Sequence, residues 1–243
     1  MRFIKFVLFI FLFVYTTSSF AQDIQLFQQF NGRYDYTAIG NTLNPFENNL
    51  DFSFCFPLES SSADLNLPAS TTITAAYLYW AGSGSGDTNV TLNGLSVEAD
   101  DTYTVDYTET TTLTYFSCYA DITSFIISEG NTTYELSDLD ITDALTNNSS
   151  YCTNRTNFAG WSIYIVYEDA TLPLNQVNLY QGLEIINRNN QEKIIEIDNL
   201  NVIDNVGAKI GFLAWEGDNS LNYGESLSIN DNVISNPPLN LGD

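Results

Sequence analysis

The stretch that decides the fold reads Gly160-Trp161-Ser162-Ile163-Tyr164-Ile165-Val166-Tyr167-Glu168-Asp169. Its side chains alternate between two sets, Trp161, Ile163, Ile165 and Tyr167 against Ser162, Tyr164, Val166 and Glu168. This two-residue period is typical of a β-strand. We therefore expect a buried scaffold strand whose Trp161 side belongs to the core. Glu168-Asp169 then marks the rim where a function could lie.

Short segments of the same character recur along the chain at intervals of about ten to fifteen residues. They are 50–56, 71–80, 89–97, 103–107, 111–119, 132–136, 177–182, 193–200, 208–215 and 225–229. Asn93-Gly94 predicts a type I′ hairpin turn, and only 121–127 and 140–145 suit short helices. These features predict an all-β, antiparallel two-sheet sandwich, with jelly-roll and immunoglobulin-like topologies both open. We expect a single domain over residues 22–243.

The amino terminus has the pattern of a secretory signal peptide. Arg2 and Lys5 precede the apolar run 6–14, and a polar segment then ends at Ser19-Phe20-Ala21. The apolar run is about half as long as a membrane-spanning helix requires, so we predict cleavage after Ala21 and no transmembrane segment afterwards.

The charge and composition exclude several functions. The chain has 30 acidic and 7 basic residues, and removal of Arg2 and Lys5 changes its formal charge from −23 to −25. Nucleic acid is therefore not expected as a partner, because phosphate contacts come from Lys and Arg. The chain has no histidine, which excludes Ser-His-Asp and Cys-His catalysis and histidine-ligated metal sites. We expect no enzymatic activity and no required cofactor.

Three cysteines remain, Cys55, Cys118 and Cys152. An exported protein is expected to form a disulfide, which leaves one thiol over. Cys118 and Cys152 bracket a polar segment with turn residues, so we predict that these two pair, stabilising the fold by roughly 4 kcal/mol. Cys55 is then expected as a free thiol, buried at least in part.

Acidic residues at predicted strand ends raise the question of Ca²⁺, which binds six to eight oxygen ligands. No acidic cluster matches the spacing of a helix-loop-helix calcium loop, and solvated turn acids are the simpler interpretation. If a Ca²⁺ site exists, its expected ligands are Asp169, Glu216 and Asp218. Trp215 ends a predicted strand beside Glu216, and it is the tryptophan we identify as a possible ligand platform.

Several phrases taken in order resemble a known family. They are 40–43 (GNTL), 76–83 (AYLYWAGS), 120–123 (ADIT), 160–169 (GWSIYIVYED), 216–218 (EGD) and 228–230 (SIN). Together they are similar to the N-terminal β-domain of unknown function in gliding-motility-associated, adhesin-like surface proteins of Bacteroidetes, which are type IX secretion cargo. The resemblance covers most of residues 31–243. It implies an exported, non-enzymatic β-domain at the cell surface, without catalytic residues to carry over.

Members of that family continue into a type IX secretion sorting domain, whereas this chain ends at Asp243 without a closing strand or a basic tail. We therefore expect a fragment of a longer surface protein, or a chain that stays in the periplasm or is released. The expected function is structural or adhesive, with loops that contact a glycan or protein surface. The alternatives are a carboxylate-dependent glycoside hydrolase, which needs two suitably spaced acids, and a lectin-like carbohydrate-binding module.

Overall fold

The structure is a computed structural model, and it describes residues 23–48, 55–197, 200, 207–217 and 226–233. The predicted signal peptide, residues 50–54 of the predicted strand 50–56, and Asp218 lie outside these residues. Every strand pair in the described part is antiparallel. The predicted all-β, antiparallel sandwich is confirmed.

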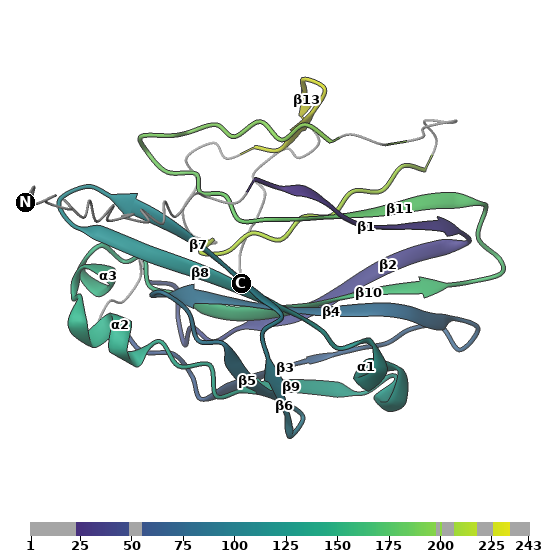
Figure 1. Ribbon diagram of the computed structural model, residues 1–243, viewed down its shortest axis with the longest axis horizontal. Coiled ribbons are helices and arrows are strands. Elements are labelled where there is room, and N and C mark those ends of the chain that lie inside the picture. The colour runs from purple at the N-terminus through teal and green to yellow at the C-terminus, as the bar shows by residue number, and fades with distance from the viewer. Residues whose placement is uncertain (1–22, 49–54, 198–199, 201–206, 218–225, 234–243) are drawn as a thin grey trace, which may run out of the picture.

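Two sheets form the sandwich (Figure 1). The larger has the order β2-β10-β4-β8-β7, with bounds Tyr34–Thr42, Ala159–Glu168, Thr72–Ser83, Thr112–Asp121 and Asp101–Thr108. The smaller has the order β3-β9-β5-β6, with bounds Ser60–Asp64, Thr133–Ser137, Asn89–Leu92 and Leu95–Glu98. Two further pairs are β1-β11 (Gln25–Gly32, Asn175–Gln181) and β12-β13 (Ser228–Ile229, Asn232–Val233).

The main core fills the space between the two sheets, and β10 contributes three of the four residues expected there, whereas Tyr167, which follows a register shift, is half-buried and lies outside the cluster. Trp161, Ile163 and Ile165 are at most 2% exposed, and all three belong to this cluster. Trp161 lies directly opposite Trp80 of β4, which is also fully buried. Burial of side chains of this size supplies the largest share of the apolar area removed from water.

The other face of the large sheet is covered by the β1-β11 pair (Figure 1). Ala75, Tyr77 and Val166 form a second cluster there with Phe27 and Phe30 of β1. A register shift between Leu26 and Gln28 marks a bulge at Phe27, whose ring contacts Tyr77 edge-on at 5.2 Å between centroids. The second cover explains why β4 and β10 carry apolar residues on both faces, as central covered strands do.

Two short helices begin in the same way. In Asp121-Ile122-Thr123, which precedes α1 (Thr123–Glu129), the Asp121 carboxylate accepts the Thr123 backbone N–H. Asp140-Ile141-Thr142 repeats this contact before α2 (Thr142–Asn147). Each aspartate satisfies a donor that the first helical turn leaves unpaired. Both helices were predicted from the sequence, within two residues of their observed starts.

The hairpin at Asn93-Gly94 is confirmed, since both residues have positive φ (46° and 82°), as a type I′ turn requires. Other predictions were wrong. The structure gives no strand over the described parts of 193–200 and 208–215, and it adds a short helix, α3 (Ser150–Thr153), which was not predicted. Strands β1, β2, β3 and β13 were not predicted.

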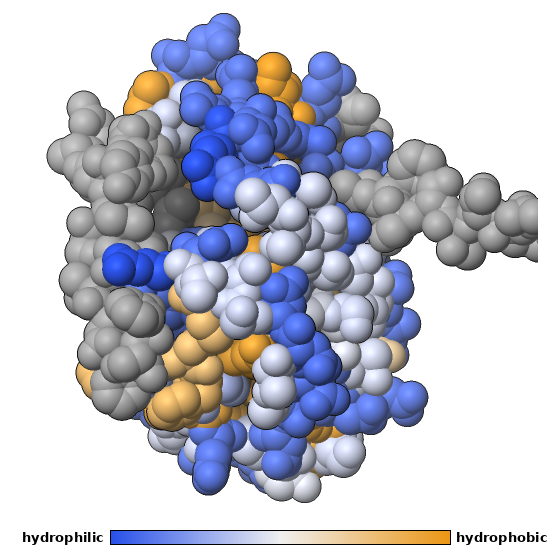
Figure 2. All heavy atoms as spheres, turned by 90° about the vertical axis from the view of Figure 1, so that its left-hand side faces the viewer, coloured by the Kyte–Doolittle hydropathy of each residue, from blue (hydrophilic) through white to orange (hydrophobic). Residues whose placement is uncertain are grey.

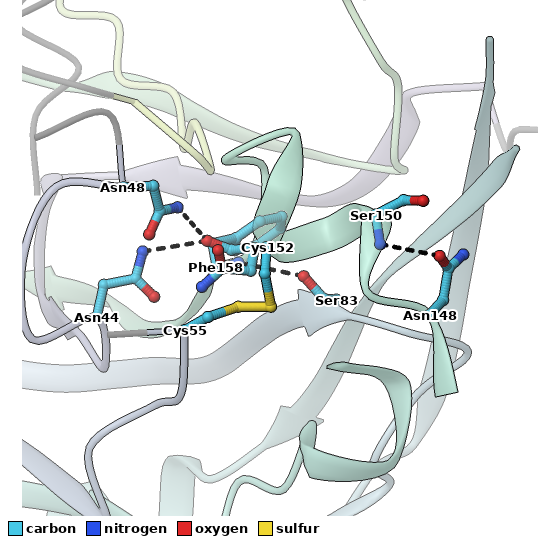
Figure 3. Close-up of a disulfide and its surroundings, with 9 residues drawn as sticks. Asn44, Asn48, Cys55, Ser83, Asn148, Ser150, Cys152 and Phe158 are labelled. Atoms are coloured by element: carbon cyan, nitrogen blue, oxygen red, sulfur yellow. Dashed lines mark hydrogen bonds between the residues drawn. A yellow bond between two sulfur atoms is a disulfide. The ribbon is translucent and has the colours of Figure 1, made fainter. Parts of the chain in front are cut away.

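The predicted Cys118–Cys152 disulfide was also wrong, because Cys55 pairs with Cys152. Cys118 lies on β8 opposite Trp80 and is buried in the main core as a free thiol, so its sulfur is not available to Cys152. Burial raises the pKa of the Cys118 thiol to about 11, although a hydrogen bond with Thr102 opposes this effect. Figure 3 shows Cys55 and Cys152 joined beside the loop that enters β10.

The same loop is held by a set of polar contacts (Figure 3). The Asn44 and Asn48 side-chain amides both donate to the Asn157 carbonyl oxygen, and the Ser83 hydroxyl accepts the Phe158 N–H at 3.1 Å. The disulfide and these contacts together fix the start of β10. A disulfide is typical of an oxidising compartment. Within the described residues, no helix is long and apolar enough to span a membrane.

We expect Cys55→Ala and Cys152→Ala each to lower the free energy of unfolding by about 4–5 kcal/mol, because the bond closes a loop of nearly one hundred residues in the unfolded chain. Urea unfolding without reductant measures the change. Cys118→Ala is the control and keeps the disulfide. A native thiol that reacts rapidly with Ellman's reagent would contradict the assignment of Cys118 as the free, buried cysteine.

Candidate functional site

The described residues line a hollow of about 190 Å³ beside the start of β10, here called the Gly160 hollow. One wall comes from the ends of β2 and β10 and the other from an extended segment after β11. Its lining residues are Gly40, Asn41, Thr42, Phe158, Ala159, Gly160, Trp161, Ser162, Leu213, Ala214, Trp215, Glu216 and Gly217. The hollow is smaller than the roughly 300–1,000 Å³ of pockets for drug-sized ligands, so it suits one ring or one side chain.

Trp215 is positioned by an aromatic stack. Its indole lies over the ring of Phe158, with centroids 6.4 Å apart and planes 15° apart. Phe158 stacks in turn on Tyr115 at 5.7 Å and 15°, and Tyr151 meets Tyr115 edge-on at 5.7 Å. Offset stacks and edge contacts of this kind are favourable ring geometries. Trp215 is therefore partly buried as one end of a fixed stack.

Gly40 and Gly160 lack side chains at positions where a methyl group would meet neighbouring atoms. A methyl group at Gly160 would lie 3.5 Å from the Trp215 ring and 3.3 Å from the Asn41 carbonyl oxygen. A methyl group at Gly40 would overlap the Trp161 carbonyl oxygen and lie 2.8 Å from Ser162 Cα. Gly40 thus permits the close approach of β2 to β10, and Gly160 leaves room for the indole.

Glu216 supplies the only carboxylate among the described lining residues. Its backbone has φ 61°, a left-handed conformation that few non-glycine residues adopt. Its charge adds to burial, the main cause, in raising the pKa of Tyr115. The Asn41 side-chain amide, also in the lining, donates to the Ser62 carbonyl oxygen at 2.9 Å and so ties the rim to β3. The hollow combines an aromatic wall with an acid and an amide.

The structure does not bring the predicted Ca²⁺ ligands together. Asp169 follows the far end of β10, where its carboxylate accepts hydrogen bonds from Thr171 and Ser70, and these bonds lower its pKa. Glu216 lies at the near end beside Gly160. The strand between them spans roughly 26 Å at 3.3 Å per residue, so the two cannot share an ion. Asp218 lies outside the described residues, and within them no group of three or more metal-ligating side chains occurs.

The segment 207–217 contacts the sandwich through an ion pair of Lys209 as well as through the Trp215 ring. Lys209 Nζ donates to the Asp35 carboxylate at 2.8 Å and to the Tyr36 carbonyl oxygen at 2.7 Å, and it lies 4.2 Å from the centre of the Tyr36 ring. Partial burial of Asp35 raises its pKa, but hydrogen bonds from Lys209 and the Tyr36 N–H, with the Lys209 charge, outweigh burial and lower it.

Only part of this site was predicted. Trp215 and Glu216 were named from the sequence, and both line the hollow. Asn41, Phe158 and Gly160 were not identified as site residues. Gly160 was read as the opening of a strand, and a single glycine in that position carries no signal for the ring that lies over it.

Comparisons with known proteins add no identification. No protein-family model matches the chain, and neither the curated proteins nor the solved structures contain a match.

The two glycines give a matched pair of tests. We expect Gly40→Ala to lower the free energy of unfolding by roughly 1–3 kcal/mol, because its methyl group meets the backbone of β10. Gly160→Ala meets only ordinary contacts, so we expect a change of less than about 1 kcal/mol. Urea unfolding measures both, and equal effects would show that the strand approach at Gly40 is not tight.

We expect Lys209→Met to raise the pKa of Asp35, which carbon NMR of its carboxyl group can follow. The folded-state pKa of Asp35 lies below the unfolded value, so its stabilisation is present above pH about 4 and is lost as pH falls through the lowered pKa. Lys209→Met should therefore lower the free energy of unfolding at pH 7, by less than about 1 kcal/mol for an exposed pair. The difference from wild type should disappear in acid.

Lys193→Met is the control for this pair, because Lys193 binds Glu184 at 2.5 Å and does not contact Asp35. An unchanged Asp35 titration in Lys209→Met would show that the ion pair is not formed in solution.

Proposed function

We propose that the protein is a secreted, non-enzymatic domain with a structural or adhesive role at a cell surface, where it contacts a glycan or protein surface. The observation that carries this proposal is the Gly160 hollow, in which Trp215 forms one wall on a rigid aromatic stack. An amphipathic ring beside polar groups is the usual means by which a shallow protein surface holds a sugar ring or an aromatic side chain.

Other features support a surface role. The large sheet is covered on both faces, and the Cys55–Cys152 bond fixes the loop at the start of β10, so the hollow is built on a stiff frame. The chain is strongly acidic, and the face at the left of Figure 1 is mostly hydrophilic or of intermediate hydropathy, with a hydrophobic patch in its lower half and smaller hydrophobic areas at the top (Figure 2). Net charge far from zero keeps an exported protein soluble and separate from anionic surfaces.

The hydrolase alternative finds less support at this hollow. Glycoside hydrolysis uses two carboxyl groups about 5–10 Å apart across the sugar. The described lining provides one, Glu216. A binding module needs only the ring platform and hydrogen-bonding groups, and the hollow offers both. Membership in the Bacteroidetes surface-protein family remains part of this proposal and accounts for the same export and surface location.

The glycan form of the proposal is tested by thermal unfolding of the chain with and without a panel of neutral, acidic and basic polysaccharides. We expect at least one to raise the melting temperature, because a ligand that binds only the folded state stabilises it. The same ligand should change tryptophan fluorescence, since Trp80 and Trp161 are fully buried and Trp215 is not.

Trp215→Ala should abolish both responses. Ile127→Ala, which truncates an exposed residue of α1, is the matched control and should keep them. If no polysaccharide shifts the melting temperature of the wild type, the glycan form is wrong and contact with protein remains.

A further inference from the structure

Strand β2 is an edge of the large sheet, with β10 on its only paired side. Its register with β10 runs without a shift from Tyr34 to Thr42. In an antiparallel pair, alternate residues direct their backbone N–H and C=O groups toward the partner and away from it. In β2 the backbone groups of the even-numbered residues face away from β10. Tyr36 shows this, since its N–H donates to the Asp35 carboxylate and its C=O accepts from Lys209.

The chain's own side chains cap both ends of this outward row. The Asn175 amide bonds both the N–H and the C=O of Tyr34, at 3.1 and 2.5 Å. Tyr36 is capped by Asp35 and Lys209, and the Asn41 side chain accepts the Thr42 N–H at 2.8 Å. Natural sheets protect edge strands in such ways, because an unpaired edge is a template for another strand.

Between the caps, Ala38 and Gly40 are left open. Both are exposed, and among the described residues neither has a hydrogen-bond partner for its outward N–H and C=O groups. Alanine has only a methyl group and glycine has no side chain, so neither residue shields its own backbone N–H and C=O groups from solvent. This opening, here called the β2 window, is continuous with the Gly160 hollow, whose lining includes Gly40, Asn41 and Thr42.

We propose that the β2 window binds an extended, basic polypeptide segment of a partner protein, which adds a strand to the large sheet and places one side chain in the Gly160 hollow. Alternating backbone donors and acceptors at strand spacing are complementary to another polypeptide backbone, which is how strand-addition sites gain affinity. Pockets for alternate side chains then give specificity. This inference rests on the proposed surface-binding function and names its partner class.

Charge selects the basic partner over a second copy of this chain. Two copies would each carry a formal charge of −23, or −25 without the predicted signal peptide. Like charges oppose association. A segment with lysine or arginine would instead be attracted by the whole chain. Trp215 and Glu216 both line the hollow, and an aromatic ring and a carboxylate both favour a cationic side chain.

The test uses the whole chain from Gln22 and two synthetic nine-residue peptides, one alternating lysine with valine and the other alternating glutamate with valine. We expect the lysine peptide to bind about tenfold more tightly or better, and added NaCl to reduce the difference. On binding, amide hydrogen exchange at Ala38 and Gly40 should slow, because their N–H groups become paired.

Ala38→Pro removes the outward N–H group without removing a bond to β10, and edge strands tolerate proline at such positions. It should weaken binding of the lysine peptide about tenfold, whereas the matched Ala38→Val, which keeps the N–H group, should retain binding. Exchange measurements on the wild-type chain keep the test valid even if Ala38→Pro folds poorly.

Equal binding of both peptides, unchanged exchange at Ala38 and Gly40, or slowing confined to the opposite edge strand β7 would each overturn the proposal. Failure here is separable from failure of the proposed function. Stabilisation by a polysaccharide depends on Trp215 and should persist in Ala38→Pro, whereas peptide binding depends on the backbone of Ala38.

Discussion

The fold depends on one transverse row of side chains at the centre of the large sheet. Trp161 and Trp80 lie opposite each other, and Cys118 lies opposite Trp80 on its other side. Each indole N–H must find an acceptor, because an unsatisfied donor in a core costs about 1–3 kcal/mol. Trp161 donates to the Ser61 hydroxyl at 2.9 Å and Trp80 to the Asp87 carbonyl oxygen at 2.8 Å. These bonds bind β3 and the β4–β5 connection to the large sheet, so the largest apolar side chains also fix how the layers meet.

The large sheet then has to be covered on its other face as well. At one end the β1-β11 pair supplies the cover, and Gln181 at the end of β11 fastens it by accepting from Tyr79 at 3.0 Å and donating to Tyr103 at 2.6 Å. At the other end the row of small residues around Gly160 is covered by the segment that carries Trp215. The candidate site is thus the junction of a stiff sheet with a segment that has no regular strand of its own.

Elements with a local sequence pattern were predicted, whereas features that depend on contacts between distant parts of the chain were missed. Strands β4 and β10 and the Asn93-Gly94 turn were predicted because their alternation and turn chemistry are local. The edge strands β2 and β3 are rich in polar and small residues, since one side of each meets solvent, and they gave no apolar alternation. The disulfide was mispredicted because spacing along the chain does not reveal that Cys118 faces the core. Trp215 was identified as a possible ligand platform, but the aromatic stack that holds it joins residues far apart in sequence and could not be predicted.

The distribution of basic residues has a consequence for proteolysis of the chain. After removal of the predicted signal peptide the chain keeps five, and three of them, Arg188, Lys193 and Lys209, follow β11. A trypsin-like protease, which cuts after lysine and arginine, therefore finds most of its sites in the segment after β11. Cuts there leave β1 through β11 covalently continuous and the Cys55–Cys152 bond intact. Such cuts would separate the segment that carries Trp215 from the strands of the sandwich, whereas cuts at the exposed Arg33 and Arg155 would fall within the sandwich itself.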